Sequence, residues 1–231
     1  MNRHVTLEIC ANGPASALAA AAGNADRIEL CENLQAGGTT PSFGSIAVTP
    51  GLVRIPIHVL IRPRPGNFVY NPVETAVIKN DIEACKHLGI NGVVFGVLTI
   101  DGEIDTEACK ALIAHARPMS ITFHRAFDEC ADPFEALEQL IGLGFDRILT
   151  SGKPGRAGEH AALLARLIHQ AGDRIILMPG GGIRPDNART LIESTGAGEI
   201  HSSCIAEAAG GASVTDPGLV RQLKDICNLQ F

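Results

Sequence analysis

The sequence contains no tryptophan and a single tyrosine, and aromatic residues make up 4% of its 231 residues. Proteins that hold single-stranded nucleic acids stack the bases on aromatic side chains, so this mode of binding is not expected. An excess of basic residues is also missing, because 19 lysine and arginine residues against 25 aspartate and glutamate residues give a net charge of −6. We therefore expect no nucleic-acid partner.

Long hydrophobic runs are absent as well. No apolar run reaches the ~18–20 residues of a membrane span, and residues 1–11 lack the charged start and apolar stretch of a signal peptide. The seven cysteines form no CxxC pair and no short Cys/His zinc spacing. Since a chain of this length can bury a sizeable core without disulfides, we expect free thiols, a cytoplasmic location and no membrane partner.

What is present is a regular alternation of short β-rich runs and helical segments. The runs recur about every 28 residues, which is the size of a βα unit. They cover residues 5–10, 27–31, 56–61, 92–97, 120–124, 147–150, 174–178 and 199–201. Eight such units predict an α/β protein whose residues 1–231 form a single (β/α)8 TIM barrel. An open, doubly wound sheet is the alternative.

Capping residues mark the boundaries of the helical segments. Asn-Pro or Asp-Pro pairs, which suit the N-cap and the first helical position, stand at 71–72, 132–133 and 216–217. Glu74 and Glu135 occupy the position of a capping-box acid. The triplet Asp-Arg-Ile recurs at 26–28, 146–148 and 173–175, and each copy is predicted to follow a helix-ending glycine and open a strand.

Function in such a barrel belongs at the C-terminal ends of the strands. Period-two alternation places Glu8 with Cys10, and Glu29 with Cys31, on the inward faces of the first two strands, in matching places. Two neighbouring thiols suit a soft cation such as Cu(I), so Cys10 and Cys31 are candidate metal ligands. The alternative is that both cysteines are small buried apolar residues.

The third and fifth strands end in further polar residues. Arg62 can recognise a carboxylate or a phosphate, or it can be a solvated loop charge. His58 is interpreted as a core histidine with satisfied hydrogen bonds. His124, followed by Arg125 and Asp128, can perform general acid–base chemistry, with hydrogen bonding of the loop to the barrel as the alternative.

A run of glycines follows the seventh strand. The N–H groups of Gly181 and Gly182, with Ser202 after the eighth strand and a helix starting near Pro185, predict an anion site, where barrels often bind phosphate. The glycines could instead only permit a tight turn.

Several segments resemble those of the CutC family. They are Leu7-Glu8-Ile9-Cys10, Ala25-Asp26-Arg27-Ile28-Glu29-Leu30-Cys31, Gly37-Gly38-Thr39-Thr40-Pro41-Ser42-Phe43-Gly44, Ile61-Arg62-Pro63-Arg64, Val94-Phe95-Gly96-Val97-Leu98, Thr122-Phe123-His124-Arg125-Ala126-Phe127-Asp128, Leu149-Thr150-Ser151-Gly152 and His201-Ser202-Ser203. The resemblance implies a cytoplasmic TIM barrel associated with copper homeostasis, with Cys10 and Cys31 at the positions proposed as Cu(I) ligands. In two respects the chain departs from the family pattern: Cys204 stands where alanine is usual, and segment 205–215 is short.

Two functions therefore remain open. One is copper handling, in which Cys10 and Cys31 hold Cu(I), with Cys130 or Cys204 nearby. The other is an enzyme of the lyase or isomerase type that acts on a small phosphorylated or carboxylated metabolite. Its anion-binding residues would be Arg62, Arg125, Gly181, Gly182 and Ser202, and its catalytic residues His124, Glu8, Glu29 and Asp128. No organic cofactor is inferred, and a homo-oligomer is compatible with either function.

Overall fold

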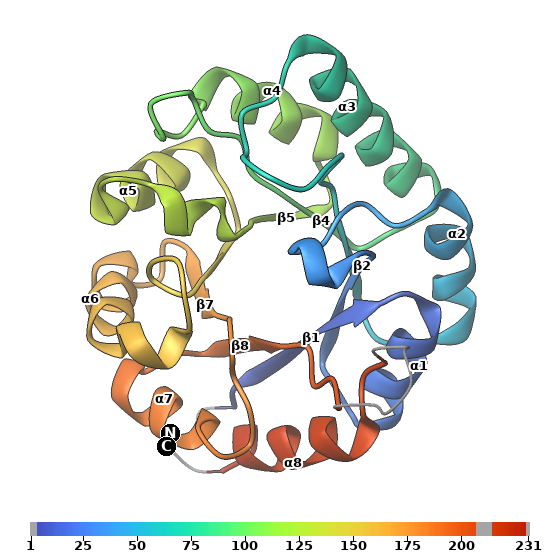
Figure 1. Cartoon of the computed structure of the whole chain (residues 1–231), viewed down its shortest axis with the longest axis vertical. Coiled ribbons are helices and arrows are strands. Elements are labelled where there is room, and N and C mark those ends of the chain that lie inside the picture. Colours follow the sequence, from blue (N-terminus) through green and yellow to red (C-terminus); the bar gives the residue numbers. More distant parts are fainter. Residues whose placement is uncertain (1–3, 207–213, 230–231) are drawn as a thin grey trace.

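A computed structural model describes residues 4–206 and 214–229. Its eight strands all run parallel in the order β7-β6-β5-β4-β3-β2-β1-β8, and a bridge between Gly180 and His201 brings β7 beside β8, so that the barrel is nearly closed (Figure 1). The strands are β1 (Thr6–Asn12), β2 (Arg27–Cys31), β3 (Ile57–Leu60), β4 (Gly92–Phe95), β5 (Ser120–Phe123), β6 (Arg147–Thr150), β7 (Ile176–Pro179) and β8 (Glu199–Ser202). The predicted TIM barrel is confirmed, and the alternative of an open sheet is wrong.

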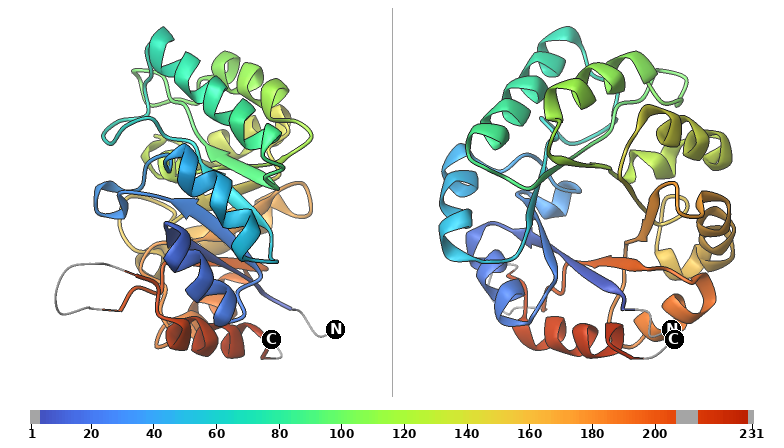
Figure 2. Two further views of the ribbon diagram at one scale, coloured as in Figure 1. Left: turned by 90° about the vertical axis from the view of Figure 1, so that its right-hand side faces the viewer. Right: turned by 180° about the vertical axis from the view of Figure 1, so that it is seen from behind.

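A ring of helices surrounds the strands in the two views along the barrel (Figures 1 and 2). The helices are α1 (Pro14–Ala22), α2 (Phe43–Leu52), α3 (Pro72–His87), α4 (Thr106–Ala116), α5 (Pro133–Leu143), α6 (Ala161–Ala171), α7 (Ala188–Thr195) and α8 (Pro217–Cys227). Short 3-10 turns at Leu34–Ala36, Arg125–Glu129 and Ala157–His160 lie in the loops. Within the described residues, no helix has both the length and the apolar character needed to cross a membrane.

The capping residues act largely as predicted. The side chains of Asn71, Asp132 and Asp216 accept hydrogen bonds from the first N–H groups of α3, α5 and α8. Glu74 completes a capping box with Asn71. For Glu135 no such reciprocal bond forms in α5, where the backbone N–H of that residue donates to Asp132.

Two of the three Asp-Arg-Ile triplets open a strand. Asp26 and Asp146 each accept the backbone N–H of the preceding strand, from Leu7 at 2.8 Å and from Ile121 at 2.7 Å. The arginine that follows each aspartate begins β2 or β6 and is buried. The third copy was wrongly predicted, because β7 begins at Ile176 and Arg174 instead pairs with Glu138 on the outside.

Strand alternation separates two layers of the interior. Leu7 and Ile9 belong to the apolar core between barrel and helices, together with Ala17 and Ala20 of α1. The inward residues of the same strand are Glu8 and Cys10. This layering places charged and thiol groups inside the barrel, as the period-two pattern predicts.

Candidate functional site at the barrel mouth

A cavity of about 310 Å³ opens at the C-terminal ends of the strands. It is lined by Cys10, Glu29, Leu34, Gly37, Leu60, Arg62, Phe68, His124, Arg125, Leu149, Gly181, Gly182, Ile183, Arg184, His201, Ser202 and Ser203. Most of the predicted site residues are thus brought together in one place. Glu8, Asp128 and Cys31 lie outside this lining.

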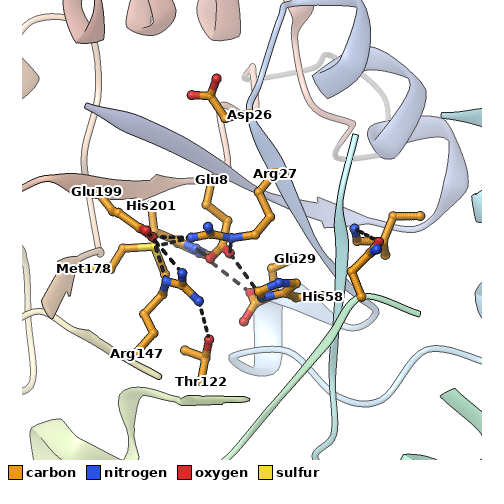
Figure 3. Close-up of polar contacts among 12 residues, drawn as sticks. Glu8, Asp26, Arg27, Glu29, His58, Thr122, Arg147, Met178, Glu199 and His201 are labelled. Atoms are coloured by element: carbon orange, nitrogen blue, oxygen red, sulfur yellow. Dashed lines mark hydrogen bonds and ion pairs between the residues drawn. The ribbon is translucent and has the colours of Figure 1, made fainter. Parts of the chain in front are cut away.

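Below the cavity, four charged side chains form a buried network inside the barrel (Figure 3). Arg27 donates to Glu8 at 2.5 Å and to Glu199. Arg147 contacts Glu199 with two nitrogens, at 2.6 and 3.2 Å. Two carboxylates and two guanidinium groups balance one another, which is how buried charges are tolerated.

Glu8 is committed to this network. Its second carboxylate oxygen lies 2.8 Å from Nδ1 of His201. Burial opposes ionisation, but the charges of Arg27 and His201 outweigh it and hold the pKa of Glu8 well below its usual range. Glu8 is therefore an ionised carboxylate with both oxygens occupied, which fits a positioning role better than proton transfer.

The two predicted cysteine ligands lie in contact, with their Sγ atoms 3.3 Å apart. The two cysteines are not paired with each other in the register of β1 and β2, however. Cys10 pairs in register with Glu29, and Cys31 pairs with Asn12. The prediction of matching places was wrong by two residues because the strands of a closed barrel are staggered.

Glu29 and His201 complete the surroundings of Cys10. The carboxylate of Glu29 lies 3.7 Å from Nε2 of His201. Burial raises the pKa of Glu29; the charge of His201 opposes this effect and the charge of Glu8 adds to it. The hydrogen bond with Cys31, followed by burial, raises the pKa of the Cys10 thiol well above its usual value. Arg27 already pairs with Glu8, so within the described residues His201 is the one basic group within 4.0 Å of Glu29.

His124 lies on the opposite side of the barrel, at the end of β5. Gly96 makes room for it, because a Cβ at that position would lie 2.7 Å from the imidazole ring. Nδ1 of His124 accepts the N–H of Ala126 at 3.2 Å, whereas Nε2 is buried without a partner among the described residues. Burial, with the charge of Arg62, lowers the pKa of His124 to about 3. At neutral pH the ring is uncharged and presents an N–H donor at Nε2.

Arg62 is a buried cation that has no carboxylate partner among residues 4–206 and 214–229. Its terminal nitrogens donate to the carbonyl groups of Ala36, Gly38 and Gly66, at 3.2, 2.9 and 2.8 Å. Its Nε is buried and unpartnered, and Phe68 packs against the guanidinium at 4.9 Å. The side chain thus fastens two loops and leaves its charge uncompensated beside the cavity.

Arg125 and Asp128 act as a pair. Asp128 is buried and accepts hydrogen bonds from Thr150, from both the backbone and side chain of Ser151, and from Arg125 at 2.8 Å. Arg125 also donates to the Ser151 hydroxyl at 2.7 Å and remains partly exposed at the cavity. Because its oxygens are all engaged, Asp128 positions Arg125 and the loop around Ser151.

The glycine loop after β7 differs from the predicted anion site in one respect. The helix α7 begins at Ala188, three residues later than predicted, and Asn187 before it donates to the carbonyl of Gly182 at 2.9 Å. Gly181 and Gly182 have φ values of +102° and +70°, which other residues adopt only with strain. Ser202 donates to the carbonyl of Ile183 at 2.8 Å and so holds this loop.

The structure does not support the sequence interpretations of His58, Cys130 and Cys204. His58 is buried, but its Nδ1 has no hydrogen-bond partner within the described ranges, so it is not a satisfied histidine. Cys130 donates to the carbonyl of Ala126 and Cys204 to Ser202, and neither belongs to the thiol pair. The departure at 205–215 lies for the most part outside the described residues.

The sequence interpretation assigned no catalytic, anion-binding or metal-binding role to several residues that build the site. These are Arg27, Arg147, Glu199, His201, Phe68 and Arg184. The signal for the first four was the same alternation that identified Glu8, since each stands on the inward face of its strand beside an outward apolar residue. Phe68 and Arg184 lie in loops, where no such pattern operates.

Comparison with known proteins agrees with the segments identified in the sequence. The sequence pattern of the CutC family matches residues 5–206. A copper homeostasis protein cutC homolog from Homo sapiens is 51% identical over 197 residues, which are 85% of this chain and 72% of the human protein. A CutC family protein from Chromobacterium violaceum is 48% identical over 203 residues, which are 88% of this chain and 82% of that protein.

Solved structures give the same result. The crystal structure of a CutC protein from Streptococcus agalactiae superposes with a TM-score of 0.83 at 34% identity and covers 86% of this chain and 98% of that one. A phosphoribosylanthranilate isomerase from Thermotoga maritima gives a TM-score of 0.60 at 14% identity, covering 96% of this chain and 98% of that chain. The second likeness concerns the barrel fold alone.

Proposed function

Because the chain belongs to the CutC family, we propose that it is a copper-handling protein of the cytoplasm that binds Cu(I) through Cys10 and Cys31. The observation that carries the proposal is the contact of the two Sγ atoms, 3.3 Å apart. Thiolates are the ligands that select Cu(I), which accepts few of them. The human relative and the Streptococcus agalactiae structure are both named for copper homeostasis, which supports the same ion.

The surroundings of the two thiols favour a bound cation. Cys10, Cys31, Leu60 and Val94 form a small buried cluster separate from the main core. Cys10 reaches the cavity while Cys31 is fully buried. A cation bound by both sulfurs would be shielded from water yet reachable from the barrel mouth. It would also reverse the raised pKa of Cys10, because a metal stabilises the thiolate.

The double substitution Cys10→Ser with Cys31→Ser is expected to abolish tight Cu(I) binding. Serine has a similar size but lacks the soft sulfur donor. Titration against a chromophoric Cu(I) chelator under reducing conditions measures the affinity. Cys130→Ser is the matched control and should retain wild-type affinity, because Cys130 lies away from the pair. Unchanged Cu(I) affinity in the double variant would exclude these two ligands.

A second candidate function is an enzyme of the lyase or isomerase type acting on a small phosphorylated or carboxylated metabolite. The observation in its favour is a polar cavity wall with unmatched groups: the uncompensated charge of Arg62 and the free Nε2–H of His124. Both residues line the cavity, so a small anion bound there would bring a negative charge to Arg62 and a hydrogen-bond acceptor to the wall that contains His124. Arg125, Gly181, Gly182 and Ser202 line the same cavity.

Phosphate or sulfate at millimolar concentration is expected to raise the melting temperature of the wild-type protein. Ligands that bind only the native state stabilise it by mass action. His124→Phe should lower this response, because it removes the Nε2 donor while keeping a ring of similar size. His87→Phe, which alters an exposed ring on α3, should respond as the wild type does. An absent response in the wild type, or equal responses in both variants, would contradict the anion site. Gly181→Val is a poor test, since φ is +102° there.

A further inference from the structure

Three different ligand atoms meet at the base of the cavity. The Sγ of Cys10, a carboxylate oxygen of Glu29 and a ring nitrogen of His201 all lie within 4.8 Å of one another, and all three residues are buried. They come from the adjacent strands β1, β2 and β8. We propose that these three side chains bind a divalent cation of the zinc type, with a fourth position open toward the cavity. This goes beyond Cu(I) binding, with which it shares only Cys10.

His201 is oriented for this role by a second carboxylate. Its Nδ1 lies 2.8 Å from Glu8, and Glu8 is in turn held by Arg27 at 2.5 Å. An Nδ1–H donated to Glu8 places Nε2 on the side of Glu29, where a bound cation would take the place of the Nε2 proton (Figure 3). Metal-binding histidines are usually fixed in this way by a carboxylate on the other nitrogen.

Glu29 lacks a permanent cation. Within the described residues, its carboxylate has no lysine or arginine nitrogen within 4.0 Å, and the nearest basic atom is Nε2 of His201 at 3.7 Å. The two arginines of the barrel interior are already engaged by Glu8 and Glu199. Buried carboxylates are tolerated when they are paired or when they coordinate a metal. A divalent cation would supply the missing positive charge.

The mixed donor set indicates the type of cation. Sulfur, nitrogen and oxygen together suit zinc, and three protein ligands with one open position are typical of catalytic rather than structural zinc sites. Zinc–ligand bonds of about 2.0–2.3 Å place tetrahedral ligands about 3.3–3.6 Å apart. The 3.7 Å between Glu29 and His201 is close to that value. The open position would lie in the cavity that Arg62 and His124 also line, so that water or a small anion could become the fourth ligand.

Metal titration of the reduced, metal-free protein tests the site. Co²⁺ should bind at one equivalent and give both a thiolate-to-metal charge-transfer band and the intense visible bands of a four-coordinate ion. Zn²⁺ should displace it. Glu29→Gln and His201→Gln should each weaken Zn²⁺ binding, measured against a chromophoric chelator, by about 100-fold or more. Circular dichroism checks that the variants are folded, and Glu29→Gln leaves the contact between His201 and Glu8 in place.

Cys31→Ser is the matched control that separates this site from the Cu(I) pair. It should leave Zn²⁺ affinity within about threefold of the wild type and remove tight Cu(I) binding. Glu29→Gln should weaken Zn²⁺ binding and leave Cu(I) affinity as in the wild type. Zn²⁺ binding that survives in folded Glu29→Gln would overturn the proposal. So would a loss of Zn²⁺ in Cys31→Ser equal to that in Glu29→Gln, since the thiol pair would then be the only metal site. If Cu(I) binding fails while this pattern for Zn²⁺ holds, only the copper proposal is lost.

Discussion

Replacing Glu199 with glutamine is expected to lower the free energy of unfolding by about 3–5 kcal/mol, the usual effect of removing one partner from a buried ion pair. Glu199 accepts hydrogen bonds from both Arg27 and Arg147 inside the barrel. Without its charge, Arg27 would keep only its ion pair with Glu8. Arg147 would then have no carboxylate partner among residues 4–206 and 214–229.

Urea unfolding of the wild type and variants measures this effect. Glu193→Gln is the matched control, since it makes the same chemical change in an exposed pair with Arg189 and should alter stability little. The double variant Glu199→Gln with Arg147→Met should be less destabilised than the sum of its single changes, by about 0.5–3 kcal/mol, because the unpaired charge is removed. Equal midpoints for Glu199→Gln and Glu193→Gln would show that the network does not stabilise the fold.

The barrel could be predicted because its signals are local. Alternation within single strands, Asn or Asp before proline, and glycine at helix ends each act over a few residues, and they locate most of the elements. The third Asp-Arg-Ile triplet shows where local pattern fails. Arg174 has the same neighbours in sequence as Arg27 and Arg147, yet it pairs with Glu138 outside the barrel because its strand starts later.

The site was harder to predict because it depends on which strands meet. Alternation placed Cys10 and Glu29 inside the barrel, but their pairing in register follows from the stagger of the closed sheet. The contact of Glu8 with His201 joins residues 193 apart in the chain and exists only because β8 pairs with β1. Protonation states depend on burial, so the neutral state of His124 could not be obtained from residue type alone.

Stability is expected to fall by about 3–5 kcal/mol between pH 6.5 and 4.5, before most carboxylates titrate. Burial lowers the pKa of His58 to about 4 and that of His124 to about 3, whereas histidines in the unfolded chain titrate near 6.5. In this window the unfolded state therefore binds more protons than the native state, so stability decreases as the pH falls. The raised pKa values of Glu29 and Asp81 act in the opposite direction and limit the loss.

His201 provides a contrast in sign. Burial opposes its protonation, but the hydrogen bond to Glu8 and the charge of Glu29 raise its pKa. Its stabilising effect is therefore complete below pH 6.5 and is lost only as the pH rises through the raised value.

Urea unfolding at half-unit steps from pH 7 to 4.5 gives the slope of stability against pH. His58→Phe and His124→Phe each remove one titrating group, so each should reduce the slope by one proton, or about 1.4 kcal/mol per pH unit. His87→Phe is the control, because its exposed ring lies on the surface of α3, and it should keep the wild-type slope. A wild-type stability that stays constant down to pH 4.5, or slopes that do not change in the two buried variants, would show that these histidines are not held neutral by burial.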